Sequence, residues 1–431
     1  MKKNKSIILY GFFVPIFIFG LAAVLPGCKE PLQEEVSLEF WGVYDDSDVF
    51  SRLIAKFNEE FSRTRIIYYK KTYETYEKDL LEAMVTGRGP DIFMLHNTWL
   101  PRYGDRISFA PESIVSFRQF QTDFVDVVIS DFSSNSAVAA LPLSVDTLAL
   151  YYNKDIFNTA SIPQSPLTWD EFLDDVEKIT VKDDKDNIIL AGAALGTARN
   201  INRSTDILSL LMLQSGLEIF NTESGQATFN EPISVNGERY RVGERALEFY
   251  TDFANPLKSV YTWNDLMHYS IDAFYEGKTA TMLNYSYHIP TIRAKASYLN
   301  FGVAAMPQIK TASKSVNYAN YWGLTVSRNS PAPDRAWQFI NWLAGNKENA
   351  RMYLELTEKP SARRDLILEQ ASDPDLGIFA EQALTARSWY QVDNRSIEQI
   401  LADMIESVVA GKTTIEEAVN KASNQITLLA K

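Results

Sequence analysis

The sequence predicts an α/β protein built as two or three domains or as one large two-lobed unit. Its 431 residues are enough for a large buried core, and 46% hydrophobic with 23% charged residues is typical of an ordered chain. Short strand-like and helix-like segments alternate at a steady pace after residue 35. Such alternation is typical of β/α units that assemble into a sheet covered by helices.

The first part of this alternation contains three strands and two helices. Apolar residues recur at helical spacing from Val49 to Phe61, which predicts an amphipathic helix with one buried face. Open parallel sheets bind ligands beyond the carboxyl ends of their strands, here residues 41–46 and 96–99. The predicted order is strand 36–44, helix 49–61, strand 65–70, helix 76–85 and strand 91–96.

The later elements are marked mainly by helix-start signals. Gly411 suits the C-terminal end of one predicted helix, and residues 201–253 are mostly helical in pattern. Further strands are predicted within 140–157, 279–286, 301–308 and 321–328. Three residue pairs have the spacing of a capping box: Thr168 with Glu171, Ser396 with Gln399, and Thr414 with Glu417.

The N-terminus carries the signature of export. Three lysines among the first five residues precede an uncharged stretch from Ser6 to Gly27, as in a signal peptide. The stretch ends in the letters LPGC, which resemble the lipobox of bacterial lipoproteins, and Cys28 is the chain's only cysteine. Residues 1–27 are therefore predicted to be a lipoprotein signal peptide, with lipidation at Cys28 and a polar tether over 28–35. The alternative is an uncleaved membrane anchor, since the run is long enough to span a bilayer.

Composition argues against nucleic acid as a partner, and no motif indicates catalysis. The 42 basic and 55 acidic side chains give a formal charge of −13, which repels a polyanion. The histidines His96, His268 and His288 lack metal-ligand spacing, and the HExxH, GxSxG and P-loop patterns are absent. We expect no metal, no cofactor and no catalytic residue. A carboxylate pair for glycoside hydrolysis stays open, because such pairs meet only in the fold.

Aromatic residues beside polar ones indicate a carbohydrate site. Aromatic residues make up 12% of the chain, and a flat ring next to hydrogen-bonding groups suits a sugar. The alternative for each ring is packing in the core. Five groups lie at predicted strand ends or in irregular segments: Trp41 and Tyr44 near Asp45 and Asp46, Trp99 near Asn97, Tyr285 and Tyr287 near Asn284, Tyr321 and Trp322 near Asn320, and Trp389 and Tyr390 near Arg387.

Several segments, in the same order, resemble those of the extracellular solute-binding proteins that feed ABC importers, the maltose-binding-protein-like family 1. The resemblance covers the chain from about Val36 to its C-terminus. The most specific segment is LPLSVDTLALYYNKDIF, residues 141–157, followed by SPLTWDEF. The others are LEFWGVYDD, GRGPDIFMLHNTWL, FYEGKTATMLNYSYHI, FGVAAMPQ, NYWGLTVSRNSPAPDRAWQFINWLAG and GKTTIEEAVNKASNQI.

The resemblance implies a type II periplasmic-binding-protein-like fold. In this fold two α/β lobes, each a β-sheet flanked by helices, are joined by hinge strands, and the ligand binds in the cleft between them. By resemblance the chain crosses between lobes near 145–148, 304–308 and 329–333. The expected N-terminal lobe is 36–145 plus 305–330, and the expected C-terminal lobe is 146–304 plus 331–431.

The resemblance also implies roles for single residues. Asp45 and Asp146 match positions that contact ligand, Tyr287 replaces a tryptophan that often stacks on it, and Trp389 falls near a C-terminal stacking aromatic. The turn after Trp41 lacks the usual glycines, so maltose itself is not implied. The full set predicted to bind ligand is Trp41, Tyr44, Asp45, Asn97, Trp99, Asp146, Trp263, Tyr285, Tyr287, Tyr321, Trp322 and Trp389.

The function implied is that of a substrate-binding lipoprotein of an ABC importer. It captures a sugar or oligosaccharide between its lobes and delivers it to a membrane permease, as a monomer held by its lipid at the outer face of the cell membrane. One alternative is a binder of another solute, such as a polyamine or phosphonate, with the same fold. The other is a surface-anchored glycoside hydrolase.

Overall fold

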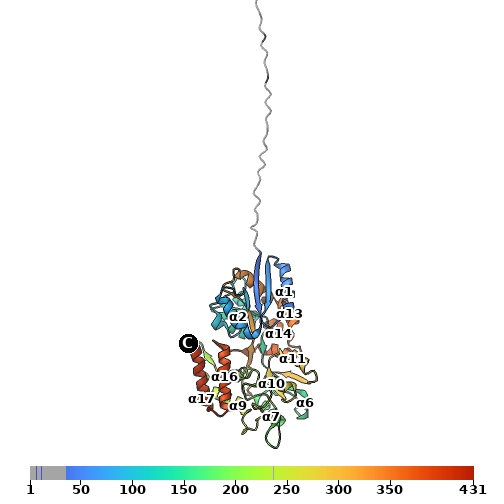
Figure 1. The fold of residues 1–431 in the computed structure, drawn as a ribbon, viewed down its shortest axis with the longest axis vertical. Coiled ribbons are helices and arrows are strands. Elements are labelled where there is room, and N and C mark those ends of the chain that lie inside the picture. Colours follow the sequence, from blue (N-terminus) through green and yellow to red (C-terminus); the bar gives the residue numbers. More distant parts are fainter. Residues whose placement is uncertain (1–5, 7–10, 12–34, 236) are drawn as a thin grey trace, which may run out of the picture. The chain divides into compact units, whose positions relative to one another are not determined.

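The computed structural model describes residue 6, residue 11, and residues 35–235 and 237–431. The predicted signal peptide, apart from those two isolated positions, and the predicted lipidation site Cys28 lie outside the described residues. Residues 36–431 form one compact unit, to which the description below is confined (Figure 1). Within the described residues no helix is both long enough and apolar enough to cross a membrane.

A six-stranded sheet forms the centre of the first lobe. β1 runs parallel to β2 and β3, as the strand–helix alternation predicts. β19 runs antiparallel to β3 and places Trp322 opposite His96. The strands, in order across the sheet, are β2 (Thr64–Lys70), β1 (Val36–Gly42), β3 (Ile92–His96), β19 (Trp322–Ser327) and β4 (Ile107–Ser108), with β7 (Leu141–Pro142) also paired to β19.

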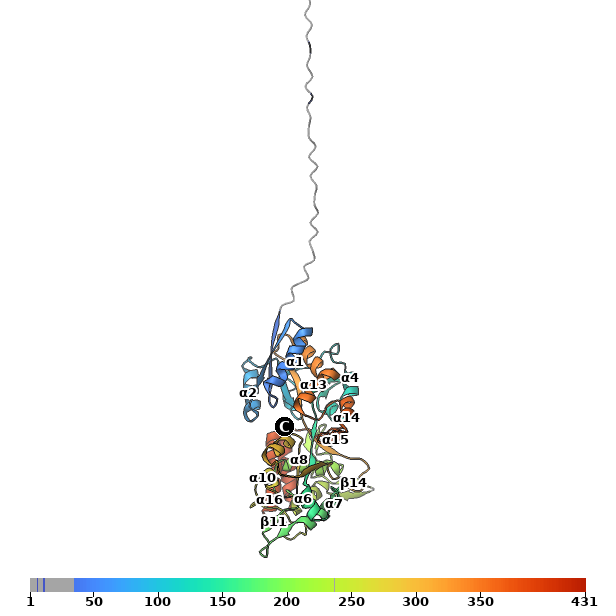
Figure 2. The same cartoon turned by 90° about the vertical axis from the view of Figure 1, so that its right-hand side faces the viewer.

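Helices from two distant parts of the chain cover this sheet. The predicted amphipathic helix is confirmed as α1, which buries Phe50, Leu53, Ile54 and Phe57. α1 lies beside α13 in both views (Figures 1 and 2), although about 300 residues separate them. The helices of this lobe are α1 (Ser47–Glu60), α2 (Tyr73–Val85), α3 (Leu100–Tyr103), α4 (Phe117–Asp123), α5 (Asp126–Asp131), α12 (Pro333–Ile340), the π-helix η1 (Asn341–Gly345), α13 (Lys347–Thr357) and α14 (Arg364–Gln370).

The second lobe is built around a three-stranded antiparallel sheet. Its order is β16 (Thr281–Asn284), β9 (Ala149–Asn153) and β17 (Phe301–Ala304). Its helices are α6 (Lys154–Thr159), α7 (Trp169–Ile179), α8 (Ser204–Gln214), α9 (Val242–Asp252), α10 (Ser270–Tyr275), α11 (His288–Lys295), α16 (Asn394–Val409) and α17 (Ile415–Leu429). Three hairpins decorate it: β10–β11 (Val181–Lys182, Ile188–Leu190), β12–β13 (Phe220–Asn221, Gln226–Ala227) and β14–β15 (Ile233–Val235, Glu238–Tyr240).

A separate three-stranded sheet lies where the chain passes between the lobes. It consists of β20 (Ala386–Arg387), β18 (Asn317–Asn320) and β8 (Asp146–Thr147), next to α15 (Gly377–Ala383). The hairpin β5–β6 (Ser133–Ser134, Ala137–Val138) belongs to the first lobe. Residues 146 and 320 are partners in this sheet, so the two hinge segments support each other directly.

Two of the three predicted capping boxes are confirmed. Thr168 and Thr414 each accept a hydrogen bond from the backbone three residues later, and the glutamate there returns one. The prediction at Ser396 is wrong, because α16 begins earlier, at Asn394. Its N-cap is Asp393, whose carboxylate accepts the backbone N–H of Ser396. An aspartate at this position caps a helix as well as a serine does.

Two separate hydrophobic cores show where the chain changes lobe. Val145 packs into the core of the first lobe and Leu148 into the core of the second. The chain therefore changes lobe between these two residues, at the position expected for the first crossing. The next change falls between Tyr318 and Ala319, later than the expected 304–308. Residues 336–367 pack into the first core, whereas the expected boundaries gave 331–431 to the second lobe. The physical reason is that α12, η1, α13 and α14 directly follow β19 and cover the first sheet.

Candidate functional site

A cavity with seven aromatic residues among the 18 in its lining lies between the two lobes. It has a volume of about 340 Å³, at the lower end of the roughly 300–1,000 Å³ range of ligand pockets. We call it the aromatic cavity. Its lining residues are Tyr44, Asp45, Tyr73, Met94, Leu143, Ser144, Asp146, Arg203, Tyr285, Ser286, Tyr287, Asn320, Tyr321, Trp322, Leu324, Tyr353, Lys359 and Pro360.

Both lobes contribute ring faces to this cavity. Tyr44 follows β1 and lies 5.5 Å from Tyr73 and 5.9 Å from Trp322, between ring centroids. Tyr287 faces them from the second lobe. The side chains of Tyr44, Tyr73 and Tyr287 remain 47%, 49% and 45% exposed. Exposed ring faces of this kind bind flat apolar surfaces of a small molecule, and the phenolic hydroxyls bind its polar edges.

Asp45 is held by two donors of the first lobe. The Tyr353 hydroxyl donates a hydrogen bond of 2.7 Å to its Oδ2, and the Lys359 ammonium donates to its Oδ1 and forms an ion pair with it. Asp45 is almost completely buried, so this pairing compensates a charge removed from water. The Asp45 carboxylate therefore has a fixed orientation in the wall of the cavity.

Asp146 joins the hinge to the second lobe. Its carboxylate accepts hydrogen bonds from the Ser286 hydroxyl at 2.7 Å, the Ser286 N–H at 3.0 Å and the Thr147 N–H at 2.9 Å. Burial raises the pKa of Asp146 to about 6, although these hydrogen bonds act in the opposite direction. Asp146 thus serves as a structural link at the floor of the cavity as well as part of its wall.

Arg203 supplies the positive charge in the second lobe's wall. Its Nη2 and Nε donate to the Tyr287 hydroxyl at 2.8 and 3.2 Å, and its guanidinium lies 5.4 Å from the ring centroid of Tyr285. Its backbone has φ 65° and ψ 21°, a left-handed conformation that is costly for a residue with a side chain. Strain of this kind persists where the surrounding structure holds a residue in place.

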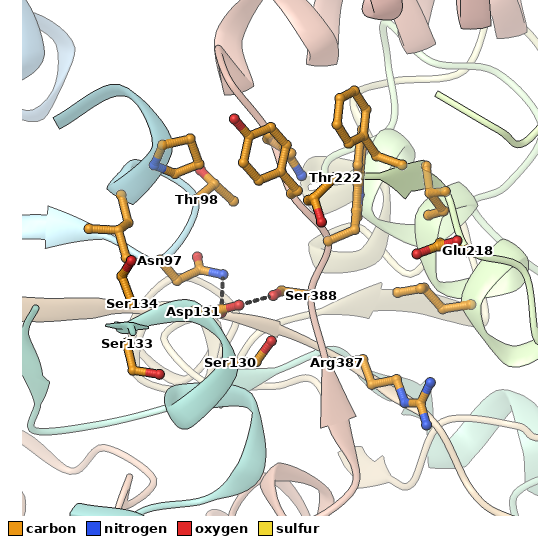
Figure 3. A pocket seen from close by; sticks show the side chains of 18 of the residues that line it. Asn97, Thr98, Ser130, Asp131, Ser133, Ser134, Glu218, Thr222, Arg387 and Ser388 are labelled. Carbon is orange, nitrogen blue, oxygen red and sulfur yellow. Dashed lines mark hydrogen bonds between the residues drawn. The ribbon is translucent and has the colours of Figure 1, made fainter. Parts of the chain in front are cut away.

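A second interlobe space, which we call the polar groove, has a volume of about 850 Å³ (Figure 3). Figure 3 shows Asp131 between Asn97 and Ser388, which both donate to its carboxylate, the former at 3.0 Å. The Tyr321 hydroxyl donates to the same carboxylate at 2.7 Å. Burial raises the pKa of Asp131 to about 6 despite these donors. Asp131 thus links the end of α5 to the segment that follows β20.

The aromatic cavity and the polar groove are distinct spaces that share no lining residue. Successive residues of an extended chain point to opposite sides, and His96 lies beside Trp322 whereas Asn97 lines the polar groove. The aromatic cavity follows the carboxyl end of β1, where an open parallel sheet binds ligands, and it collects exposed ring faces. We therefore take the aromatic cavity as the candidate site.

The lobes also touch directly beside the aromatic cavity. The Trp99 indole N–H of the first lobe donates a 3.0 Å hydrogen bond to Oδ1 of Asn394, at the start of α16. Arg102 lies 3.8 Å from Asp393 in the same place. Trp99 itself is buried and stacks on Tyr103, with ring centroids 5.2 Å apart. These contacts hold the two lobes together along one side of the site.

The structure distributes the predicted ligand residues over several environments. Those that line the aromatic cavity are Tyr44, Asp45, Asp146, Tyr285, Tyr287, Tyr321 and Trp322. Asn97 and Trp389 line the polar groove, and Trp99 lies in the wall of a small neighbouring pocket. Trp41 is buried with the Lys71 ammonium 3.5 Å from its ring centroid, and Trp263 is fully buried with its N–H on Asn200. Trp41 and Trp263 line neither space.

Sequence reasoning missed several lining residues. Tyr73 follows the second strand, so its position at a strand end was a usable signal. Tyr353 and Lys359 come from α13 and the loop after it, far in sequence from Asp45, and nothing local marks them. Arg203 precedes α8 and likewise carries no sequence signal of its role.

Comparison with known proteins agrees with this architecture. The family profile "Bacterial extracellular solute-binding protein" matches residues 44–350. The chain is 22% identical over 438 residues to the maltodextrin-binding protein MdxE of Bacillus subtilis, covering 99% of this chain and 97% of that one. It is 21% identical over 399 residues to the galactooligosaccharide-binding protein of the same organism, covering 90% and 87%.

Solved structures show the same fold. The cyclic alpha-maltosyl-1,6-maltose binding protein of Arthrobacter globiformis superposes with a TM-score of 0.76 at 19% identity, covering 92% of this chain and 99% of that one. The sugar-binding protein MalE of Xanthomonas citri superposes with a TM-score of 0.74 at 18% identity, covering 92% and 97%. The expected two-lobed α/β fold is therefore confirmed. The chain belongs to the family of bacterial extracellular solute-binding proteins.

Proposed function

We propose that this protein captures a sugar or oligosaccharide in the aromatic cavity and delivers it to the permease of an ABC importer. The observation that carries this proposal is the cavity itself, with ring faces from both lobes and hydrogen-bonding groups between them. Relatives that bind maltodextrin and galactooligosaccharide cover most of the chain, which supports the same class of ligand. The cavity volume of about 340 Å³ is within the roughly 300–1,000 Å³ range of small-molecule pockets.

The mechanism that fits this geometry is closure of the lobes around the ligand. A ligand that contacts Tyr44 and Trp322 on one lobe and Tyr287 on the other stabilises the closed arrangement, in which both sets of contacts form. Micromolar affinity corresponds to about 8 kcal/mol. A few charge-assisted hydrogen bonds of roughly 1.5–3 kcal/mol each, with ring stacking, supply much of the gross interaction energy, which must also offset the cost of ordering the ligand. Closed and open forms present different surfaces to a permease.

Titration calorimetry with a panel of mono-, di- and oligosaccharides tests the proposal. We expect one class of sugar to bind, and small-angle scattering of the same samples to show a smaller radius of gyration when that sugar is present. If no sugar binds and a polyamine or phosphonate does, the protein is a binding protein for that other class of solute. Turnover of a chromogenic glycoside would show instead that the protein is a hydrolase.

We further propose that the mature protein is a monomer attached by lipid at Cys28 to the outer face of the cell membrane. The basic start, apolar run and LPGC letters support this. Expression in a bacterial host with a radiolabelled fatty acid should label the wild type and leave Cys28→Ser unlabelled. If the wild type takes up no label and keeps its full N-terminus, the uncleaved anchor is the better description; equal labelling of Cys28→Ser would place the lipid elsewhere.

A further inference from the structure

The starting observation is an arginine with unused donors in the wall of the aromatic cavity. Both hydrogen bonds of the Arg203 guanidinium go to one acceptor, the Tyr287 hydroxyl, so its Nη1 group bonds to no side chain that the structure describes. Within the described chain, no carboxylate lies within ion-pair distance of Arg203. Arg203 is half-buried in the wall of the cavity, where a charged donor that makes no direct contact is unfavourable.

The acids close to the cavity already have other partners. Asp206, on the first turn of α8, accepts the Tyr285 hydroxyl at 2.8 Å. Asp45 is paired with Lys359, and Asp146 is satisfied by Ser286. Asp206 and Glu398 attract the Arg203 guanidinium electrostatically, but neither forms an ion pair or a hydrogen bond with it. Lys359 is paired with Asp45, so among the described lining residues the Arg203 Nη1 group is the cationic donor left for an incoming ligand.

The chemistry of a guanidinium indicates which ligand group would bind to the free donors of Arg203. Its planar set of N–H donors matches the two oxygens of a carboxylate, or those of a phosphate, in a bidentate pair. Neutral hydroxyls accept single hydrogen bonds from it and do not make the charge-assisted bidentate pair. The left-handed backbone at Arg203 favours glycine, yet an arginine is present and points its head at the cavity.

We propose that the ligand of the aromatic cavity is an acidic saccharide, whose carboxylate or phosphate binds Arg203 while its ring lies among Tyr44, Trp322 and Tyr287. This inference rests on the proposed function, because it specifies the class of sugar that the same site takes. The negative group accepts from the Arg203 Nη1 donors, to which no described side chain bonds, and the aromatic faces on the opposite lobe hold the sugar ring. A uronic acid or a sugar phosphate has this chemistry.

The test compares saccharides in matched pairs. Calorimetry is run with galacturonate and galactose, glucuronate and glucose, their acidic and neutral disaccharides, and glucose 6-phosphate with glucose. We expect the acidic member of at least one pair to bind tenfold or more tightly than its neutral partner, and the carboxylate and phosphate arms to separate the two sources of charge. If the neutral member binds as tightly in every pair that binds, this inference fails and the proposed function stands. If no saccharide binds, both fail.

Variants make the assignment specific to Arg203. Arg203→Gln should lose tenfold or more in affinity for the acidic sugar and little for its neutral partner, whereas Arg203→Lys should retain part of the preference. Arg199→Gln is the matched control, since Arg199 is exposed and pairs with Asp403 away from the cavity. Thermal unfolding of each variant separates lost binding from lost folding. An acidic-sugar preference that survives in folded Arg203→Gln would overturn the role of Arg203.

Discussion

The hydroxyl of Tyr353 donates a 2.7 Å hydrogen bond to Oδ2 of Asp45, across 308 positions of sequence. This contact ties the turn after β1 to α13 and, together with Lys359, fixes one wall of the aromatic cavity. The site thus depends on a helix that the chain adds late to the first lobe. Binding and stability are therefore linked at Asp45.

Asp45→Asn should destabilise the protein by about 1–3 kcal/mol, because it leaves the partly buried Lys359 ammonium without its charged acceptor. Urea unfolding at neutral pH measures the change. Asp46→Asn is the control, since Asp46 pairs with Lys70 on the exposed surface, where such pairs contribute about 0–1 kcal/mol. Equal losses for the two variants would contradict the structural role given to Asp45.

Trp99→Phe should weaken ligand binding about fivefold while the lobe stays folded. The change removes the hydrogen bond to Asn394 that joins the lobes, and such a bond contributes about 1 kcal/mol. The control is Trp342→Phe, which removes an indole bond to Glu60 within the first lobe, also 3.0 Å long. Calorimetry should show a loss for Trp99→Phe alone. Equal affinities in the two variants would mean that this contact does not stabilise the closed form.

Tyr287→Ala should lower ligand affinity tenfold or more with little loss of stability. The ring is nearly half exposed, so its removal leaves no large internal cavity, but it takes away both a stacking face and the acceptor of Arg203. Tyr298→Ala, a tyrosine of the same lobe that is 74% exposed and lies outside the cavity, serves as the control. Unchanged affinity in Tyr287→Ala would place the ligand elsewhere.

Asp131→Asn should flatten the pH dependence of stability between pH 5 and 7.5. The folded-state pKa of about 6 lies above the ordinary value, so the folded protein binds this proton more tightly than the unfolded chain does. The stability from this group is therefore greatest at low pH and is lost as pH rises through about 6. By linkage, the free energy of unfolding of the variant should fall by about 1 kcal/mol less than that of the wild type as the pH rises over this range.

Urea unfolding at several pH values checks this expectation. Asp126→Asn, on the exposed face of the same helix, is the control and should keep the wild-type profile. Burial also raises the pKa of Asp146 to about 6, so Asp146 contributes a pH dependence of the same sign. This contribution is present in both variants. A steeper profile in Asp131→Asn than in the wild type would reverse the sign argued here.

Helix ends were only partly predictable from local sequence. The capping boxes at Thr168 and Thr414 form as their four-residue patterns predict, whereas the same spacing at Ser396 fails because Asp393 caps α16. Trp99 was correctly placed at a strand end, but whether its ring is free depends on Tyr103 and on Asn394 in another lobe. The role of Arg203 depends on Tyr287, 84 positions later. Such relationships exist only after the chain has folded.

The pairing of β19 with β3 has a consequence for how the protein is made. Trp322 meets His96 across 226 positions, so the first sheet cannot be completed until about three quarters of the 431 residues have left the ribosome. Folds that rely on pairings this distant form slowly, because a long loop must close before the contacts reward it. A nascent chain of this design therefore lacks a complete first sheet during most of its synthesis.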